Sequence, residues 1–133
     1  RMATTKQNTT VQCVMQPDSI AGARSLIDQI YVDEKIAQYI VDLVQTSRTP
    51  EVVSEELAEF VEYGASPRAT LALTLCARGN AFLEGRGYVV PQDVKDLAHD
   101  VLRHRIATTY EAEAEGKTSD DIVTAILDFV PVP

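Results

Sequence analysis

Residues 64–70 read Gly64-Ala65-Ser66-Pro67-Arg68-Ala69-Thr70, and this stretch has the pattern of a loop that turns into a helix. Gly64 frees the backbone, the Ser66 side chain can cap the first amides, and Pro67 suits the first helical turn. Arg68 then falls one residue inside the helix start, where unpaired amides and the helix dipole favour an anion. Its planar guanidinium can hold two phosphate oxygens at once. The alternative is that Arg68 is solvated or paired with a carboxylate, as most arginines near a helix start are.

Five segments with apolar residues at helical spacing predict a mainly all-α fold, a small helical bundle. The predicted helices cover residues 19–29, 34–46, 67–84, a segment that begins at residue 91, and 119–130. The central helix, 67–84, is apolar on nearly every side, which predicts that the other helices enclose it. Residues 54–61 predict one or two short helical turns.

The connecting segments predict little regular structure. Val11, Cys13 and Met15 alternate with polar residues, which predicts a short strand. Residues 88–90 and 105–108 predict two extended pieces that can pair with each other, so at most a short two-stranded pairing is expected. Residues 110–117 predict an acidic connector. Residues 1–17 are rich in Thr, Gln and Asn, which is typical of a flexible arm or the remnant of an artificial boundary.

The composition is that of one globular domain. The chain has 133 residues, of which 45% are hydrophobic and 24% are charged, enough for a single core. No apolar run approaches the ~18 residues that span a membrane, and the polar residues 1–12 predict no signal peptide. Cys13 and Cys76 lie far apart and predict reduced thiols of a cytoplasmic protein, with Cys76 in the core.

The net charge of −8 is unevenly distributed. Residues 51–62 contain five glutamates and no base, and residues 110–133 contain six acids and one lysine. An acidic balance of this kind argues against a nucleic-acid groove, which needs a basic face. It favours solubility or a basic partner surface.

No complete catalytic or metal site can be read from the sequence. Gly116-Lys117-Thr118 matches the end of a phosphate-binding P-loop, but Glu111 stands where its first glycine is required. His99 and His104 are not spaced as metal ligands on one helix face. Phosphoryl transfer also needs a P-loop and carboxylates for Mg²⁺, so we expect this chain by itself not to be an enzyme.

Several ordered blocks resemble the lid domain of MoxR-type AAA-plus ATPases over roughly residues 31–133. The blocks are Gly64–Ala69 (Gly-Ala-Ser-Pro-Arg-Ala), Gly85–Val94 (Gly-Arg-Gly-Tyr-Val-Val-Pro-Gln-Asp-Val), Val101–Ile106 (Val-Leu-Arg-His-Arg-Ile), the acidic Tyr110–Glu115, and Ile126–Pro133. The resemblance implies that residues 18–133 are a helical lid domain that includes the acidic tail 110–133. It also implies an α/β core domain that precedes residue 1 and carries the ATPase machinery.

The resemblance further implies roles for individual residues. Arg68 corresponds to the sensor 2 residue, which approaches the γ-phosphate of ATP. Tyr39, Ile40, Ala65 and Ala69 would line the adenine side of the nucleotide pocket. For Tyr39 and Ile40 the alternative is that both are ordinary core residues.

For the whole protein, the resemblance implies ATP with Mg²⁺ as cofactor, a hexameric ring and a cytoplasmic location. It implies that hydrolysis drives remodelling or assembly of client proteins, together with von Willebrand A-type partner proteins and without nucleic acid or membrane. Two alternatives stay open. One is a free-standing helical interaction module that binds no nucleotide, and the other is the lid of a magnesium-chelatase-like ATPase subunit.

Overall fold

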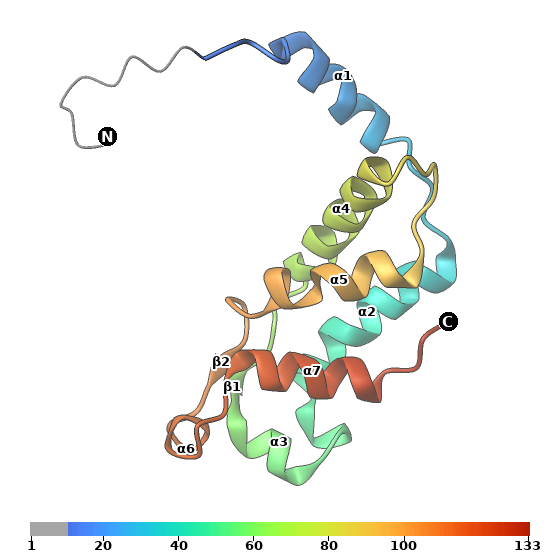
Figure 1. Cartoon of the computed structure of the whole chain (residues 1–133). Helices are drawn as coiled ribbons and strands as arrows, with labels where there is room; N and C mark the ends of the chain where they lie inside the picture. The colour runs from blue at the N-terminus through green and yellow to red at the C-terminus, as the bar shows by residue number, and fades with distance from the viewer. Residues whose placement is uncertain (1–10) are drawn as a thin grey trace, which may run out of the picture.

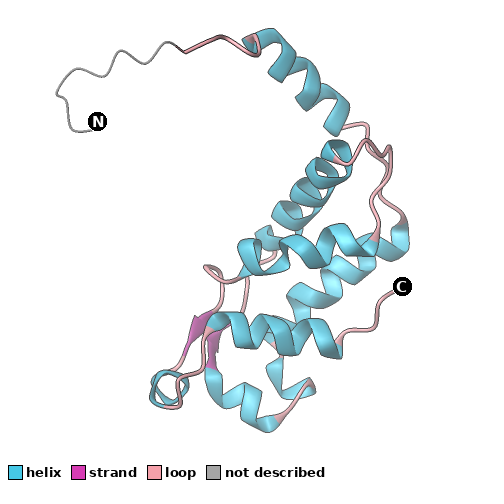
Figure 2. Cartoon of the chain, in the orientation of Figure 1, coloured by secondary structure: helices cyan, strands magenta, loops and turns pink. Residues whose placement is uncertain are grey.

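A computed structural model describes residues 11–133, and this part of the chain is mainly helical (Figures 1 and 2). The predicted all-α class, with one short pair of strands, is confirmed. In chain order the elements are α1 (Pro17–Ile27), α2 (Glu34–Arg48), the 3-10 turn η1 (Pro50–Val52), α3 (Glu55–Phe60), β1 (Val61–Tyr63), α4 (Arg68–Leu83), α5 (Pro91–Leu102), β2 (Ala107–Thr108), α6 (Tyr110–Ala114) and α7 (Ser119–Phe129).

Helices α2, α4, α5 and α7 form the core of the bundle. α4 packs on α2 and α5, and α7 packs on the same two helices from another side. The largest fully buried side chains come from all four helices: Tyr39, Ile40 and Leu43 from α2, Leu73 from α4, Val94 and Leu102 from α5, and Ile122, Val123 and Ile126 from α7. Burial of this apolar surface is the main force that holds the four helices together.

Helix α1 lies outside this core and extends away from the bundle (Figure 1). None of its residues is buried. Residues 11–16, which precede it, have no regular secondary structure, so the predicted strand around Cys13 is wrong. Alternating residues form a strand only beside another strand, and within the described residues β1 and β2 pair with each other. The rest of the predicted arm, residues 1–10, lies outside the described part of the chain.

The strand pairing differs from the predicted one. β1 and β2 are antiparallel, with Val61 opposite Thr108 and Tyr63 opposite Ala107. Tyr88 instead forms a parallel bridge with Tyr31. The predicted pairing of 88–90 with 105–108 is wrong because α5 separates them: its 12 residues span about 18 Å, which places the two pieces at opposite ends of one helix.

Helix α4 is not enclosed, which corrects the prediction for residues 67–84. Its buried face consists of Ala69, Leu73, Ala77 and Ala81. On the other side Leu71 is 67%, Leu75 54% and Leu83 81% exposed. Cys76 is also exposed, so its predicted place in the core is wrong. The small alanines bring α4 close to its neighbours along one side only, and no other described element covers the opposite side.

No helix in residues 11–133 is both long enough and apolar enough to cross a bilayer. The segment predicted as an acidic connector contains the short helix α6, whose N-terminus is capped by the Thr109 hydroxyl. Likewise the Thr118 side chain caps α7 by accepting from the Asp121 N–H.

Candidate functional site

The turn before α4 is tied to the end of α2 by close backbone contact. A Cβ atom on Gly64 would overlap the Ser47 carbonyl oxygen and lie 2.7 Å from the Arg48 Cα. The Ala65 N–H donates to the Ser47 hydroxyl (2.9 Å), and that hydroxyl donates to the Val44 carbonyl (2.6 Å). Ser47 is fully buried. Position 64 therefore requires glycine because of close packing, and the contact sets where α4 begins.

Helix α4 begins without a side-chain cap. Pro67 is the N-cap residue and has helical dihedral angles, φ −55° and ψ −21°. The Ser66 side chain does not cap the helix, which corrects the prediction; instead the Ser66 carbonyl accepts from the Ala69 N–H (2.8 Å) and the Pro67 carbonyl from the Thr70 N–H (3.1 Å). The N–H groups of Ala69 and Thr70 are therefore already hydrogen-bonded, so attraction of an anion to the start of α4 depends mainly on the charge of Arg68.

Arg68 presents an available guanidinium at this turn. The residue is exposed, and within residues 11–133 its side chain forms neither a hydrogen bond nor an ion pair. The alternative in which Arg68 pairs with a carboxylate is therefore not seen among the described residues. The backbone of such an arginine is fixed, and its guanidinium can bind an external anion without first breaking a contact.

The four residues predicted on the adenine side come from α2 (Tyr39 and Ile40), from the turn before α4 (Ala65) and from the first turn of α4 (Ala69). Tyr39 is 2% exposed, and Ile40, Ala65 and Ala69 are completely buried. All four pack in the core, and their predicted contact with adenine stays a prediction. Within the described residues the Tyr39 hydroxyl has no hydrogen-bond partner, and burial raises the pKa of this side chain.

A buried ion pair connects the far end of α4 to the start of α5. The Arg86 guanidinium donates to both Asp93 oxygens, at 2.6 and 2.9 Å, and to the Tyr88 carbonyl at 2.9 Å. Asp93 also accepts from the Asn80 side chain (2.9 Å) and from the Val90 N–H (2.8 Å). Burial alone would raise the pKa of Asp93, but the hydrogen bonds from Arg86, Val90 and Asn80 outweigh it and hold that pKa below its ordinary value. Asp93 is therefore ionised although it is 1% exposed.

The family described as AAA lid domain matches residues 54–126 of this chain. The matched span begins at the cap of α3, contains the Arg68 turn and the Arg86–Asp93 pair, and ends within α7. It covers more than half of the chain. The chain belongs to the AAA lid domain family.

The relatives of this lid domain include proteins of the MoxR type. Chaperone MoxR1 of Mycobacterium tuberculosis is 38% identical over 104 residues, which are 77% of this chain and 28% of MoxR1. Protein MoxR of Methylorubrum extorquens is 34% identical over 88 residues, 65% of this chain and 24% of that protein. The lid domain thus spans about a quarter of the length of these two relatives.

The crystal structure of a protein from Cytophaga hutchinsonii, provisionally described as an ATPase, has the same fold. It superposes on the lid domain with a TM-score of 0.83 at 38% identity, over 87% of this chain and 36% of that one. Together with the MoxR relatives, this similarity identifies the chain as a MoxR-type AAA-plus lid domain.

Two features of the lid domain escaped the sequence analysis. Ser47 gave no signal, because a single serine near a helix end is ordinary in any sequence. For Arg86 and Asp93 the sequence signal was weak. Asp93 follows Val90 by three residues at the start of a helix that Pro91 opens, and in this pattern the carboxylate accepts from the backbone N–H of the cap residue. The pattern does not reveal that an arginine from the preceding turn completes the site.

Proposed function

We propose that this chain is the lid of a MoxR-like AAA-plus ATPase and closes over ATP that a core domain of the same protein holds. In this proposal Arg68 acts as the sensor 2 residue and contacts the γ-phosphate. The observation that carries the proposal is the exposed guanidinium of Arg68, which has no partner within residues 11–133 and lies on a turn whose backbone is held by Ser47 and Gly64. Loss of the γ-phosphate would remove the charged partner of Arg68 and allow the lid to rotate.

The uncovered face of α4 supports the same proposal. Leu71 and Leu75 follow Arg68 at helical spacing, so the exposed apolar side chains and the guanidinium lie along one side of the helix. A core domain placed against this side would bury the leucines and bring its nucleotide to Arg68. In this proposal the buried residues Tyr39, Ile40, Ala65 and Ala69 lie on the adenine side of the nucleotide.

The remaining parts of the proposal concern the whole protein. Its core domain would bind ATP with Mg²⁺, and its subunits would form a hexameric ring in the cytoplasm. Hydrolysis would drive the remodelling or assembly of client proteins, with von Willebrand A-type proteins as partners. The name Chaperone MoxR1, carried by one relative, supports such a role.

The test is Arg68→Ala in the full-length protein, with ATPase rate and melting temperature measured on the same preparation. We expect the rate to fall by about 10²-fold, as when one charge-stabilising donor is removed from an active site. Stability should change by no more than about 0.5 kcal/mol, because the side chain is exposed and has no partner among the described residues. Arg68→Lys should restore only part of the rate, since an ammonium lacks the planar fork.

Arg24→Ala is the matched control, because Arg24 is an exposed arginine on α1. It should leave both quantities unchanged. An Arg68→Ala protein with intact turnover and a lowered melting temperature would end the sensor proposal.

A further inference from the structure

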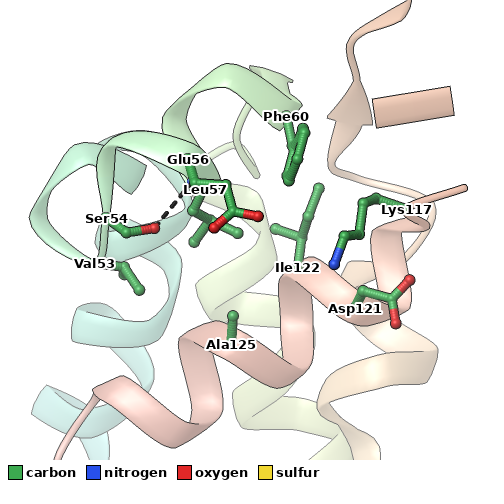
Figure 3. A pocket seen from close by; sticks show the side chains of 9 residues that line it. All are labelled: Val53, Ser54, Glu56, Leu57, Phe60, Lys117, Asp121, Ile122 and Ala125. Atoms are coloured by element: carbon green, nitrogen blue, oxygen red, sulfur yellow. Dashed lines mark hydrogen bonds between the residues drawn. The ribbon is translucent and has the colours of Figure 1, made fainter. Parts of the chain in front are cut away.

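A small apolar pit lies between α3 and α7 (Figure 3). Its volume is about 190 Å³. Its apolar lining comes from both helices and the preceding turn, and three charged residues stand around it: it is lined by Val53, Ser54, Glu56, Leu57, Phe60, Lys117, Asp121, Ile122 and Ala125. We call it the α3–α7 pit. An apolar cavity of about 150 Å³ is large enough to bind benzene, so the pit can take an aromatic ring or a leucine side chain.

The pit lies where the two acidic segments of the sequence meet. Eleven of the 20 acids but one of the 12 bases fall in residues 51–62 and 110–133, so each segment carries −5 and the rest of the chain carries +2. The structure brings the segments together: the Thr109 hydroxyl, at the start of α6, donates to the Glu59 carbonyl of α3 (2.7 Å). All of the net negative charge is thus contributed by the two segments that form the pit and its surroundings, and such a field attracts a basic partner.

The charged residues at the pit differ in whether their side chains already have partners. Asp121 completes the capping box of α7 with Thr118, because its Oδ2 accepts from both the Thr118 N–H (2.8 Å) and the Thr118 hydroxyl (2.7 Å). Within the described residues Glu56 and Lys117 form no side-chain hydrogen bond and no ion pair. Figure 3 shows Glu56 and Lys117 on opposite sides of the apolar lining, Glu56 beside Leu57 and Lys117 beside Ile122. A partner can therefore pair with Glu56 without displacing an existing contact.

We propose that the α3–α7 pit binds one bulky apolar side chain, of leucine or phenylalanine size, from a partner protein whose neighbouring residues are lysine or arginine. The apolar side chain fills the space between Leu57 and Ile122, and a flanking cation pairs with Glu56. Lys117 opposes such a partner and limits its affinity. This inference does not depend on the nucleotide role of Arg68, because no pit residue belongs to the 64–70 turn or to α4.

The test uses the 133-residue chain and a fluorescent peptide in which one phenylalanine is flanked on both sides by lysines. Isotope-edited NMR on the unmodified chain maps where the peptide binds, and the signals of Leu57, Phe60, Ile122 and Ala125 should shift. Replacing the peptide's phenylalanine with serine should weaken binding about tenfold or more, which corresponds to burial of one apolar side chain. Replacing its lysines with glutamates should abolish binding.

Variants of the chain separate the apolar contribution from the charge. Ala125→Phe fills the pit without changing the charge and should weaken binding about tenfold or more. Glu56→Gln should weaken it about two- to fivefold, and Lys117→Ala should strengthen it by a similar factor. Glu111→Gln is the matched control: it removes an exposed acid of the acidic segment 110–133 that does not line the pit, and it should change affinity less than twofold. Circular dichroism confirms that each variant is folded.

Several results would overturn the proposal. No binding up to about 1 mM peptide is one, and equal binding of the serine peptide is another, since it would mean general charge attraction. NMR shifts confined to the exposed leucines of α4 would assign the peptide to a different surface. Concentration-dependent shifts of the pit residues without peptide would show that a second copy of the chain occupies it, and would also refute the proposed partner. If Ala125→Phe does not fold, the NMR map on the unmodified chain still decides.

Discussion

Replacing Asp93 with alanine should destabilise the domain more than any other single change to a charged residue in α5. The carboxylate accepts four hydrogen bonds, two from Arg86 and one each from Asn80 and the Val90 N–H. Asp93 itself is 1% exposed, so the alanine variant leaves these donors without their acceptor inside the protein. Asp96 on the same helix is exposed, and Asp96→Ala is the matched control.

The expected size follows from burial. Removal of one partner of a buried ion pair costs about 3–5 kcal/mol. The Arg86 side chain is 26% exposed and water can reach it, so we expect the lower end, about 3 kcal/mol. Domains of this size are stable by about 5–15 kcal/mol, and each kcal/mol shifts the melting temperature by about 4 °C. The variant should therefore unfold on the order of 10 °C lower, whereas Asp96→Ala should change stability by no more than about 0.5 kcal/mol.

The pH dependence gives a second measurement on the same variant. The pKa of Asp93 is lowered in the folded chain, so its stabilisation is present above the pKa of about 3.9 in the unfolded chain and is lost as the pH falls through the folded pKa. Urea unfolding should show a constant gap between the unmodified chain and Asp93→Ala from pH 7 to about pH 5, and a narrowing gap below about pH 4. Equal urea midpoints at pH 7, or a gap that does not narrow in acid, would refute this account of the pair.

Three further predictions concern buried groups of α2 and α4, and each is tested by thermal or urea unfolding. Ser47→Ala should cost about 1–3 kcal/mol, because it leaves the buried Ala65 N–H without an acceptor; an unchanged midpoint would contradict the contact. Leu73→Ala should cost about 2–5 kcal/mol, whereas the exposed Leu71→Ala should cost much less, and similar losses would mean that α4 is enclosed after all. Tyr39→Phe should not lower stability, since it removes a buried hydroxyl that has no partner among the described residues; a clear loss would show that the hydroxyl is bonded.

The positions of the main helices could be predicted because their signals are local. α2, α5 and α7 each combine a start signal with apolar residues three and four apart: Asp33 caps α2, Pro91 opens α5, and the Thr118 segment caps α7. Both kinds of signal act within a few residues of the chain. The candidate site residue Arg68 was also accessible to this reasoning, because a glycine, a proline and an arginine before an apolar run mark a helix start.

Contacts between segments far apart in the sequence could not be predicted in the same way. Tyr31 bridges to Tyr88 rather than to a sequence neighbour, and Ser47 meets Gly64 across the end of α2. Any of several extended pieces could have paired with residues 105–108. Their choice depends on the length and direction of α5, which only the assembled bundle determines.

The sequence by itself determined that this chain is a helical lid domain, since helix signals are local and the ordered family blocks are specific. Only the tertiary structure decided which side of α4 is uncovered and that residues 51–62 and 110–133 meet around one apolar pit. It also decided that the guanidinium of Arg68 has no partner in the part of the chain that the structure describes. The physical reason is the same in each case. Exposure, pairing and charge clustering depend on which surfaces pack together, and packing is a property of the whole folded chain.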